Sequence, residues 1–543
     1  MRVRTTGSLL VLFLSFAVNV CATPVHLWSH NYGDSDDQYT DALFTDPAGN
    51  VFLVGSFYGS VSIATPYTSL GRRDAIVAKW DANGNPLWSK RVGFKSVDTG
   101  WAGTTDNGGN VIMAGSTGPH PNERDAFIAR YAPDGTQQWI KYFIAGTDSI
   151  AYVQVVACDG TKHILVAGAF SGSINLGGST FVGQQDNDSF MAEFDAAGNH
   201  IWSKKLHATN GLEVKGIAVD TNGQPALFGA FAGQIDFGGG PLTSASSSNL
   251  FLVKFDTNGN HVWSHRYGET SDFGAGTMAM DPTGRIAITG EMWGNVNFGG
   301  GLLTPITAPD IFLAVFNSAG SHLWSKRFGD ADQDGGDWVS FASNNDVILS
   351  ATAQGPGAID FGGGPMTLTT DIYSTCVGRF FPNNGVLRWQ KKFSGNDNVY
   401  GMACETHGQF ILGGTYLGTL NLGGNDLASA GNEDWFIARF TEQLTAAGPT
   451  LARASLAQNS PNPFNPTTQI AYTLAAPARA VIEIVDVSGS VVARIDEGMQ
   501  PAGAHHTIWN GRDDDGTPAA SGVYFYRLQG MPDVAARKMV LLK

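Results

Sequence analysis

The stretch DAIVAKW-DANGN-PLWSKRVG at residues 74–93 decides the fold of this chain. Apolar and polar residues alternate over 74–80, where β-branched and aromatic side chains are frequent. An Asn-Gly turn at 81–85 then leads into a second alternating segment that contains Trp88. Alternation on both sides of such a turn is typical of a β-hairpin.

The same hairpin recurs with a period of about 60 residues, which indicates a repeat architecture. Its tryptophan has seven copies, at Trp28, Trp88, Trp139, Trp202, Trp263, Trp324 and Trp389. A second hairpin precedes the first in each unit, with a turn such as 46–50 followed by the strand VFLVGSF at 51–57. The aspartate that opens this turn can accept its backbone N–H groups, and the glycine supplies the positive φ that closes it.

A glycine interrupts the second strand of most units, and a glycine at such a place indicates close approach of another backbone. These glycines are Gly55, Gly115, Gly168, Gly229, Gly290 and Gly414, whereas the sixth unit has Ala351. Four strands per unit and seven units predict an all-β fold, a seven-bladed β-propeller over residues 24–442. The mature chain begins with a lone Trp28-type strand and the last unit, at 434–440, lacks one, so we expect the N-terminal strand to complete the seventh blade and close the ring.

Composition excludes several classes of protein. The 543 residues carry a net charge of −15, with 15% charged and 43% hydrophobic residues, and 69 are glycine. A chain this apolar is not disordered, and an acidic chain without a basic stripe is not a nucleic-acid-binding protein. The acidity lies outside the C-terminal module, where eight basic residues balance eight acidic ones between Leu451 and Lys543.

The N-terminus has the layout of a secretory signal peptide. Arg2 and Arg4 precede an apolar run over 9–20, and we predict a signal peptide at 1–22 with cleavage after Ala22. Lipid attachment at Cys21 is the alternative, which the bulky Val20 disfavours. The run is too short to span a bilayer, and no later segment is long enough. The remaining cysteines, Cys158, Cys376 and Cys404, are unclustered and are interpreted as small buried hydrophobic residues.

The repeated unit, with its Asp-x-x-Gly-Asn-Val, Gly-Ser-Phe, Asp-Ala-Phe-Ile-Ala-Arg-Tyr and Asp-x-x-Gly-x-x-x-Trp elements, resembles the repeats of bacterial secreted seven-bladed β-propeller proteins. The resemblance covers roughly three quarters of the chain. It implies a propeller fold and an exported protein, and it implies little about the ligand.

A different module follows a small-residue linker at 443–458. Residues 459–543 contain six or seven short alternating strands and predict a small Ig-like β-sandwich. NPFNPTT at 462–468, VDVSGSVV at 485–492, TIWNGRDDDG at 507–516, SGVYFYRL at 521–528 and the terminal RKMVLLK resemble the C-terminal sorting domain of type IX secretion (type A) and the related FlgD-like Ig domain. This resemblance implies export across an outer membrane and contact with secretion machinery, with the protein attached to or released from the cell surface.

Candidate functional residues are sought at the end of the propeller that carries the long loops. Acidic residues there predict a ligand face, with Asp37, Asp98, Asp272, Asp334 and Asp397 as its members, and solvated loops are the alternative interpretation. Asp330, Asp332 and Asp334 match the opening of a calcium loop, but the acid that an EF-hand needs falls at Phe341. Calcium is thus the one candidate ion, and no cofactor is expected.

No set of catalytic residues stands out in the sequence. The Asp-x-x-Gly-x-x-x-Trp spacing resembles motifs of quinoprotein dehydrogenases and sialidases, but tryptophans that pack between blades explain it. His200, His261 and His322 lie on outer strands of different blades and cannot converge on a metal. The sequence therefore predicts an exported, non-enzymatic propeller at the bacterial surface or outside the cell, which binds a carbohydrate or a surface protein. A secreted hydrolase or lyase acting on polysaccharide is the alternative, and two carboxylates together with a His, Tyr or Arg at the channel mouth would favour it.

Overall fold

The computed structural model describes residues 18–118, 124–146, 149–159, 163–183, 188–269, 272–306, 309–368, 373–393, 399–406, 408–449, 455–474, 478–500, 503–529, 531 and 534–543. They fall into two compact units, Ala22–Gln443 and a C-terminal unit from Leu444 onward. All regular elements of these residues are strands, and no helix suited to crossing a membrane is found among them. Most of the predicted signal peptide lies outside the described residues.

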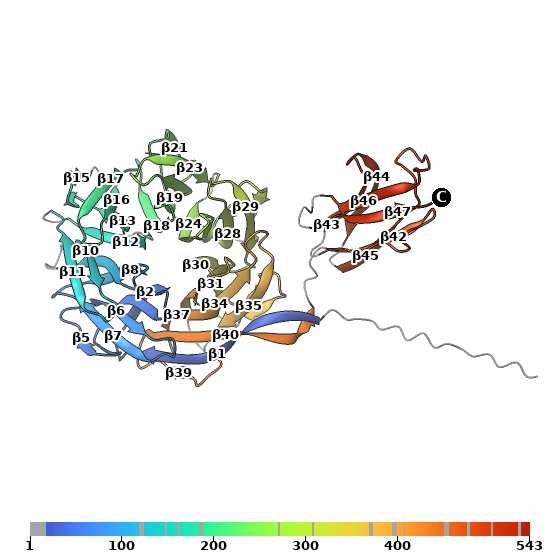
Figure 1. Cartoon of the computed structure of the whole chain (residues 1–543). Coiled ribbons are helices and arrows are strands. Elements are labelled where there is room, and N and C mark those ends of the chain that lie inside the picture. Colours follow the sequence, from blue (N-terminus) through green and yellow to red (C-terminus); the bar gives the residue numbers. More distant parts are fainter. Residues whose placement is uncertain are drawn as a thin grey trace, which may run out of the picture. The chain divides into compact units, whose positions relative to one another are not determined.

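The larger unit holds, within its described residues, seven four-stranded sheets that follow one another around a ring (Figure 1). The innermost strands are β2 (Gln38–Thr45), β8 (Thr99–Thr105), β12 (Ala151–Cys158), β18 (Leu212–Val219), β24 (Phe273–Met280), β30 (Asp334–Phe341) and β36 (Val399–Thr406). The second strands are β3 (Val51–Phe57), β9 (Val111–Thr117), β13 (Ile164–Phe170), β19 (Pro225–Phe231), β25 (Ile286–Met292), β31 (Val347–Gln354) and β37 (Gln409–Tyr416). The third strands are β6 (Asp74–Trp80), β10 (Asp125–Tyr131), β16 (Asp188–Phe194), β22 (Asn249–Phe255), β28 (Asp310–Phe316), β34 (Tyr373–Phe380) and β40 (Asp434–Pro449). The outermost strands are β7 (Pro86–Val92), β11 (Gln137–Phe143), β17 (His200–Leu206), β23 (His261–Tyr267), β29 (His322–Phe328), β35 (Leu387–Phe393) and β1 (Val18–Tyr32).

The ring is closed by the N-terminal strand, as predicted. Each innermost strand contacts the next one, and β36 contacts β2. β1 is the outermost strand of the last sheet, in the order β1-β40-β37-β36, and lies beside β40 in Figure 1. His26 lies against Gly423 and Gly424, as His200 lies against Gly177 and Gly178 in an earlier sheet. β1 therefore occupies the place that the fourth strand has in the other sheets.

The repeated tryptophan docks each sheet onto the next. In six sheets its indole Nε1 donates a hydrogen bond to a turn of the following sheet, for example from Trp324 to the carbonyl oxygen of Pro382 at 2.8 Å. In the sixth sheet Trp389 Nε1 donates instead to the Glu442 carboxylate of β40 at 2.9 Å. The last sheet docks onto the first in the same way, from Trp28 to the carbonyl oxygen of Ala82 at 3.2 Å. A glycine of the same turn packs against the indole ring of the tryptophan. The interpretation that these tryptophans pack between blades is therefore confirmed.

The two ends of the ring differ in their connections. At one end the chain makes tight turns, in which an aspartate such as Asp46 accepts the backbone N–H groups of Ala48 at 3.0 Å and Asn50 at 2.9 Å. The opposite end carries the links between sheets and the longer links between second and third strands. Among the residues that the structure describes, six of these longer links form small two-stranded sheets: β4 (Ser60–Ser62) with β5 (Pro66–Thr68), β14 (Ser173–Asn175) with β15 (Thr180–Val182), β20 (Gln234–Asp236) with β21 (Pro241–Thr243), β26 (Val296–Asn297) with β27 (Leu302–Leu303), β32 (Gly357–Ile359) with β33 (Met366–Leu368), and β38 (Thr419–Leu420) with β39 (Leu427–Ala428).

Hydrophobic side chains fill the space between neighbouring sheets. Cys376 lies in one of these cores and Cys404 in another, and both are buried, while Cys158 packs half-buried against a third. Their interpretation as small hydrophobic residues therefore agrees with the structure for the two buried ones.

The C-terminal unit is a sandwich of two sheets. One has the order β41 (Ser455–Leu456), β42 (Thr468–Leu474), β45 (Gly503–Trp509), and the other β44 (Val491–Gln500), β43 (Ala478–Val485), β46 (Gly522–Leu528), β47 (Arg537–Leu541). Trp509, Tyr526 and Met539 are buried between them. The prediction of an all-β propeller followed by an Ig-like domain is confirmed. The segment predicted as a linker, 443–458, differs in that β40 continues to Pro449 beside β1 and that β41 lies within it.

Candidate binding site in the central channel

The innermost strands carry an extra residue at the same register. A β-bulge interrupts the pairing with the second strand in six of the sheets in the described part of the chain. The inserted residues are Asp41, Trp101, Gln154, Lys215, the pair Gly276 and Thr277, and Asp337. Each is exposed or half-buried in a strand whose flanking residues are mostly buried. Because bulges re-aim side chains, these residues form a ring that faces the channel.

The bulges explain the glycines of the second strands. A Cβ on Gly229 would overlap the carbonyl oxygen of Glu213 in β18, and the same overlap occurs at Gly55, Gly115, Gly168 and Gly290. The close backbone approach that the glycines predicted is therefore that of the bulged strand itself. In the sixth sheet the position is Ala351, which pairs with Gly336.

Next to this ring, the innermost strands of two adjacent sheets have glycines in place of larger side chains, and a cavity lies there. At the level where β2 has Tyr39 and β12 has Tyr152, strands β24 and β30 have Gly274 and Gly335. A cavity of about 380 Å³ lies here, and its charged lining residues are Glu213, Lys215, Glu291 and Asp337. The repeat is therefore broken where polar groups converge.

The glycines also admit a carboxylate from behind the innermost strands. Glu291 belongs to the second strand β25, yet a Cβ on Gly274 would lie 3.1 Å from its Oε2. A Cβ on Gly335 would lie 3.0 Å from Glu291 Oε1 and 3.6 Å from Asp337 Oδ1. The carboxylates of Glu291 and Asp337 thus flank the same small space.

Burial raises the pKa of both carboxyl groups. The pKa of Asp337 rises to about 7 because the channel walls desolvate it and Glu291 repels its negative charge, while a hydrogen bond with Thr352 opposes the shift. Its side chain is exposed to water within the channel, but protein surrounds it on all sides. Burial also raises the pKa of Glu291, and the positive charge of Lys215 opposes this. Lys215 Nζ makes an ion pair with Glu213 Oε1 at 2.7 Å.

The raised pKa of Asp337 predicts a pH-dependent stability. Folding raises its pKa from 3.8 to about 7, so the folded protein holds a proton that the unfolded chain has lost between these values. Its contribution to stability therefore falls as the pH rises through this range and stays low above it. Asp337→Asn is expected to raise the melting temperature more at pH 8 than at pH 5. Scanning calorimetry at both pH values measures this, with Asp36→Asn at an exposed loop position as the control, and equal gains at both pH values would contradict it.

The acidic residues predicted from the loops have other roles. Asp98 is fully buried and accepts backbone N–H groups of Phe94 at 2.7 Å and Gly118 at 2.8 Å. Asp334 is buried and accepts the N–H of Asp330 at 3.1 Å. These two carboxylates accept hydrogen bonds from the backbone of the loops.

Of the other three predicted residues, two are described. Asp272 is exposed and accepts hydrogen bonds from Ser247 Oγ at 2.6 Å and the N–H of Ser248 at 3.1 Å. Asp37 accepts one from Tyr39 Oη at 3.1 Å and lies at the channel mouth. Asp397 lies outside the described residues. The four described residues, Asp37, Asp98, Asp272 and Asp334, lie at or directly before the start of the innermost strands of different sheets.

The calcium candidates form a turn. Asp330 accepts the backbone N–H groups of Asp332 at 2.9 Å and Ala358 at 2.5 Å, while Asp334 accepts that of Asp330. Within the described ranges, no group of three or more His, Cys, Asp or Glu side chains is arranged to hold a metal ion. The three outer-strand histidines stay in separate sheets, as expected: His200, His261 and His322 each lie 2.9–3.0 Å from a serine of their own strand.

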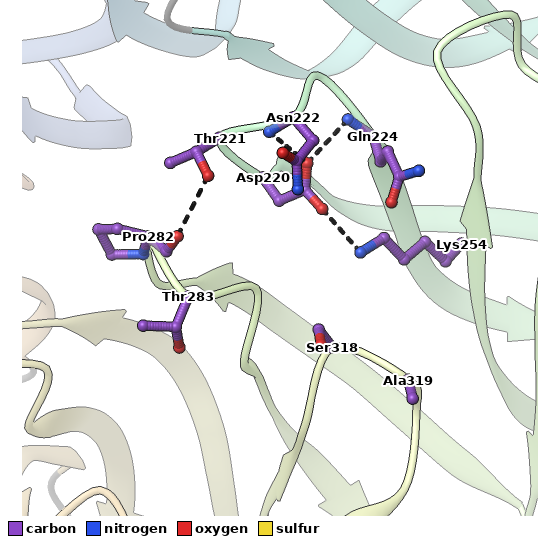
Figure 2. Close-up of a pocket in the computed structure, with 9 residues that line it drawn as sticks. All are labelled: Asp220, Thr221, Asn222, Gln224, Lys254, Pro282, Thr283, Ser318 and Ala319. Carbon is purple, nitrogen blue, oxygen red and sulfur yellow. Dashed lines mark hydrogen bonds and ion pairs between the residues drawn. The ribbon is translucent and has the colours of Figure 1, made fainter.

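A second pocket lies at the tight-turn end, and Figure 2 shows its residues. Asp220 accepts hydrogen bonds from the N–H groups of Asn222 and Gln224 and pairs with buried Lys254 at 2.8 Å. Thr221 Oγ1 donates to the carbonyl oxygen of Pro282 in the next sheet at 3.4 Å. The charged groups of this pocket, which has about 210 Å³, already satisfy one another, so it is a weaker candidate than the channel.

Sequence reasoning missed Glu213, Lys215, Glu291 and Asp337. The sequence-based prediction placed the ligand face in the loops, whereas these four residues lie on strands. The available signal was a departure from the repeat: the second strand of the fifth unit reads Gly-Glu-Met where others read Gly-Ser-Phe or Gly-Ala-Phe. Glycines also replace larger residues in the innermost strands of the fifth and sixth units, at 274 and 335.

Comparison with known proteins identifies one part of the chain. Residues 460–532 match the family model of the FlgD Ig-like domain. Over 333 residues the chain is 22% identical to the regulatory protein FlaEY of Caulobacter vibrioides, which covers 57% of this chain and 34% of that protein. Over 504 residues it is 21% identical to an uncharacterized WD repeat-containing protein, L264, of Acanthamoeba polyphaga mimivirus, which covers 72% and 36%. The chain thus spans about a third of the length of these relatives.

Solved structures give distant similarities. The quinohemoprotein alcohol dehydrogenase from Comamonas testosteroni has a TM-score of 0.40 and 11% identity, and the match covers 80% of this chain and 78% of that one. PorZ of Porphyromonas gingivalis, a surface component of the type-IX secretion system, has a TM-score of 0.22 and 12% identity, with coverages of 94% and 74%.

Proposed function

We propose that this chain is an exported protein that binds a carbohydrate in the central channel of its propeller. The observation that carries the proposal is the cavity beside Gly274 and Gly335, which is lined by Glu213, Lys215, Glu291 and Asp337. Its volume of about 380 Å³ lies in the range of small-ligand sites. Carboxylate and ammonium groups at fixed positions suit the hydroxyl groups of a sugar, which both donate and accept hydrogen bonds.

Export is supported by both ends of the chain. The apolar run at 9–20 behind two arginines has the pattern of a signal peptide. The FlgD Ig-like match at 460–532 is compatible with a module for secretion or surface attachment, of which type IX sorting is the form that the sequence motifs favour. We place the protein on the outer surface of a bacterium or outside the cell, where its partners would be glycans, surface proteins and secretion machinery.

A polysaccharide-cleaving enzyme is the second candidate function. The paired carboxylates of Glu291 and Asp337 favour it, because an acid with a pKa of about 7 can protonate a leaving oxygen while an ionised carboxylate activates water. The two functions share the site and differ in turnover. Release of reducing ends from a bound glycan would show turnover, and its loss in Asp337→Asn would assign it to this site.

The proposal is tested by screening the full chain on a glycan array and measuring the affinity of the bound glycans. Glu291→Gln and, at pH 8 where Asp337 is ionised, Asp337→Asn remove negative charge from the cavity with little change in volume. Each is expected to weaken binding at least about tenfold, since a hydrogen bond to a charged group contributes about 1.5–3 kcal/mol. Asp36→Asn removes the same charge from an exposed position at the same end and is expected to bind as the wild type does. Unchanged affinity in both cavity variants would contradict the proposal.

A further inference from the structure

The channel wall opposite the cavity has a different chemistry. Strands β2, β8 and β12 present Tyr39, Trp101 and Tyr152 where the cavity has glycines and carboxylates. The Trp101 and Tyr152 rings lie 6.1 Å apart between centroids. Arg73 packs with its Cζ 5.4 Å from the centre of the Tyr39 ring. Aromatic rings and arginine therefore line this side of the channel.

A second arginine occupies the equivalent place in the next sheet. Arg73 and Arg124 each directly precede a third strand, and each forms a parallel bridge with the segment that enters the next innermost strand, at Val97 and Ile150 respectively. Arg73 Nη2 donates to Thr99 Oγ1 of β8 at 2.8 Å. Burial and the negative charge of Glu213 raise the pKa of the Tyr152 hydroxyl, and the positive charge of Arg124 opposes this. The two guanidinium groups thus belong to adjacent sheets at the channel mouth, and we call Arg73, Arg124, Trp101 and Tyr152 the arginine wall.

The arginines of this wall make no ion pair at contact distance with the described residues. Asp41 of β2 is the carboxyl group nearest in effect to Arg73: burial raises its pKa to about 7, and the positive charge of Arg73 opposes this. Most other arginines of the propeller make ion pairs: Arg91 with Asp74, Arg130 with Asp106, Arg285 with Asp281, Arg327 with Asp310, and Arg379 with Asp346. Neither Arg73 nor Arg124 makes one with any described residue, in a chain whose net charge is −15. The Nε of Arg73 is buried and has no hydrogen-bond acceptor among the described residues.

We infer that the arginine wall binds the carboxylate of an acidic sugar, so that the channel takes a uronate-bearing glycan. This inference rests on the proposed carbohydrate-binding function and names its substrate class. A guanidinium group binds a carboxylate through two parallel hydrogen bonds, and the adjacent Trp101 and Tyr152 rings offer flat apolar faces to a sugar ring. The carboxylates across the channel, Glu291 and Asp337, repel a ligand that is charged on all sides. One negative group on an otherwise neutral sugar fits both walls.

The test compares ligands that differ only in the acid. Titration calorimetry with the full chain uses oligogalacturonate, its methyl-esterified form and a sulfated oligosaccharide of the same length. The free acid is expected to bind at least about tenfold more tightly than the ester, with an affinity that falls as salt is raised. Arg73→Gln and Arg124→Gln are each expected to remove most of this preference for the free acid. Arg73→Lys is expected to retain part of it, because lysine keeps the positive charge but lacks the two parallel N–H donors of the guanidinium group. Arg72→Gln, at the exposed neighbouring arginine, is expected to keep it.

The outcomes separate this inference from the proposed function. Equal binding of acid and ester, or an unchanged preference in both arginine variants, would overturn the uronate assignment even if Glu291→Gln and Asp337→Asn weaken binding. Tighter binding of the sulfated oligosaccharide would overturn the carboxylate as the preferred anion. If no glycan binds and the cavity variants change nothing, the proposed function itself fails. Circular dichroism of each variant checks that the sheets are intact.

Discussion

Replacement of residues 24–32 by a glycine-serine segment of equal length is expected to destabilise the propeller by on the order of 5 kcal/mol. The segment supplies Trp28, whose indole docks on the first sheet, and Tyr32, whose Oη accepts a hydrogen bond from Trp80 Nε1 at 2.9 Å. Its loss would leave β40 as an unpaired edge that carries large apolar side chains. We expect a lower melting temperature and the appearance of oligomers, because exposed strand edges pair with other chains.

Thermal unfolding and size-exclusion chromatography measure these effects. Leu27→Ser is the matched control, since Leu27 lies on the same strand with 45% of its surface exposed and should not affect closure. A rescue is available from the repeat itself. In six sheets the fourth strand follows the third through a short turn, so moving residues 24–32 behind residue 440 through such a turn should restore stability. A replaced chain that melts at the wild-type temperature would show that closure contributes little.

Much of the fold is readable from the sequence because each repeated contact depends on residues close together in the chain. An aspartate that caps its own turn, as Asp46 does, needs only the next four residues. The Trp28-type docking recurs seven times. The spacing of these tryptophans in the sequence therefore indicates how many sheets there are and that each sheet packs against the next one. Closure could be predicted because one strand was missing at the end of the array and one was spare at its start.

The candidate site could not be predicted in this way because it depends on what the repeat omits. Gly274 and Gly335 matter through absent side chains, and Glu291 reaches the channel only because those side chains are absent. A carboxylate's role also depends on burial, which the local sequence does not reveal. Asp98 and Asp37 both stand in acidic loops, yet the first is fully buried as a cap and the second is half-buried at the channel mouth.

The charged residues of the channel differ between its two sides, so the net charge of the whole chain does not describe the charge that a ligand meets in the channel. On the side of β18, β24 and β30, three carboxylates face one lysine. On the side of β2, β8 and β12, two arginines make no ion pair with the described residues, and the carboxyl group of Asp41 interacts with Arg73. The net charge of −15 therefore does not predict a cationic ligand for the channel. A ligand that places one negative group on the arginine wall and hydroxyl groups in the cavity uses both sides.

Gly229→Ala is expected to destabilise the propeller and to weaken ligand binding together. The added Cβ would lie well inside 3.0 Å of the Glu213 carbonyl oxygen, and backbone atoms of a hydrogen-bonded strand cannot rotate away as a side chain can. Overpacking costs about 1–3 kcal/mol, and we expect the upper part of that range. Any relief has to come from shifting the bulge of β18, which would displace Glu213 and Lys215 from the cavity.

The sixth sheet provides the control for this prediction. Ala351 occupies there the position that Gly229 has in the fourth sheet, opposite a bulge that contains glycine. Ala351→Gly is therefore expected to cost only about 1 kcal/mol, the conformational entropy of a strand glycine, and to leave ligand affinity unchanged. Denaturant titrations of both variants compare the costs. A Gly229→Ala variant as stable as Ala351→Gly would mean that the bulges yield easily, and the cavity residues could then not be held in place by the strand register.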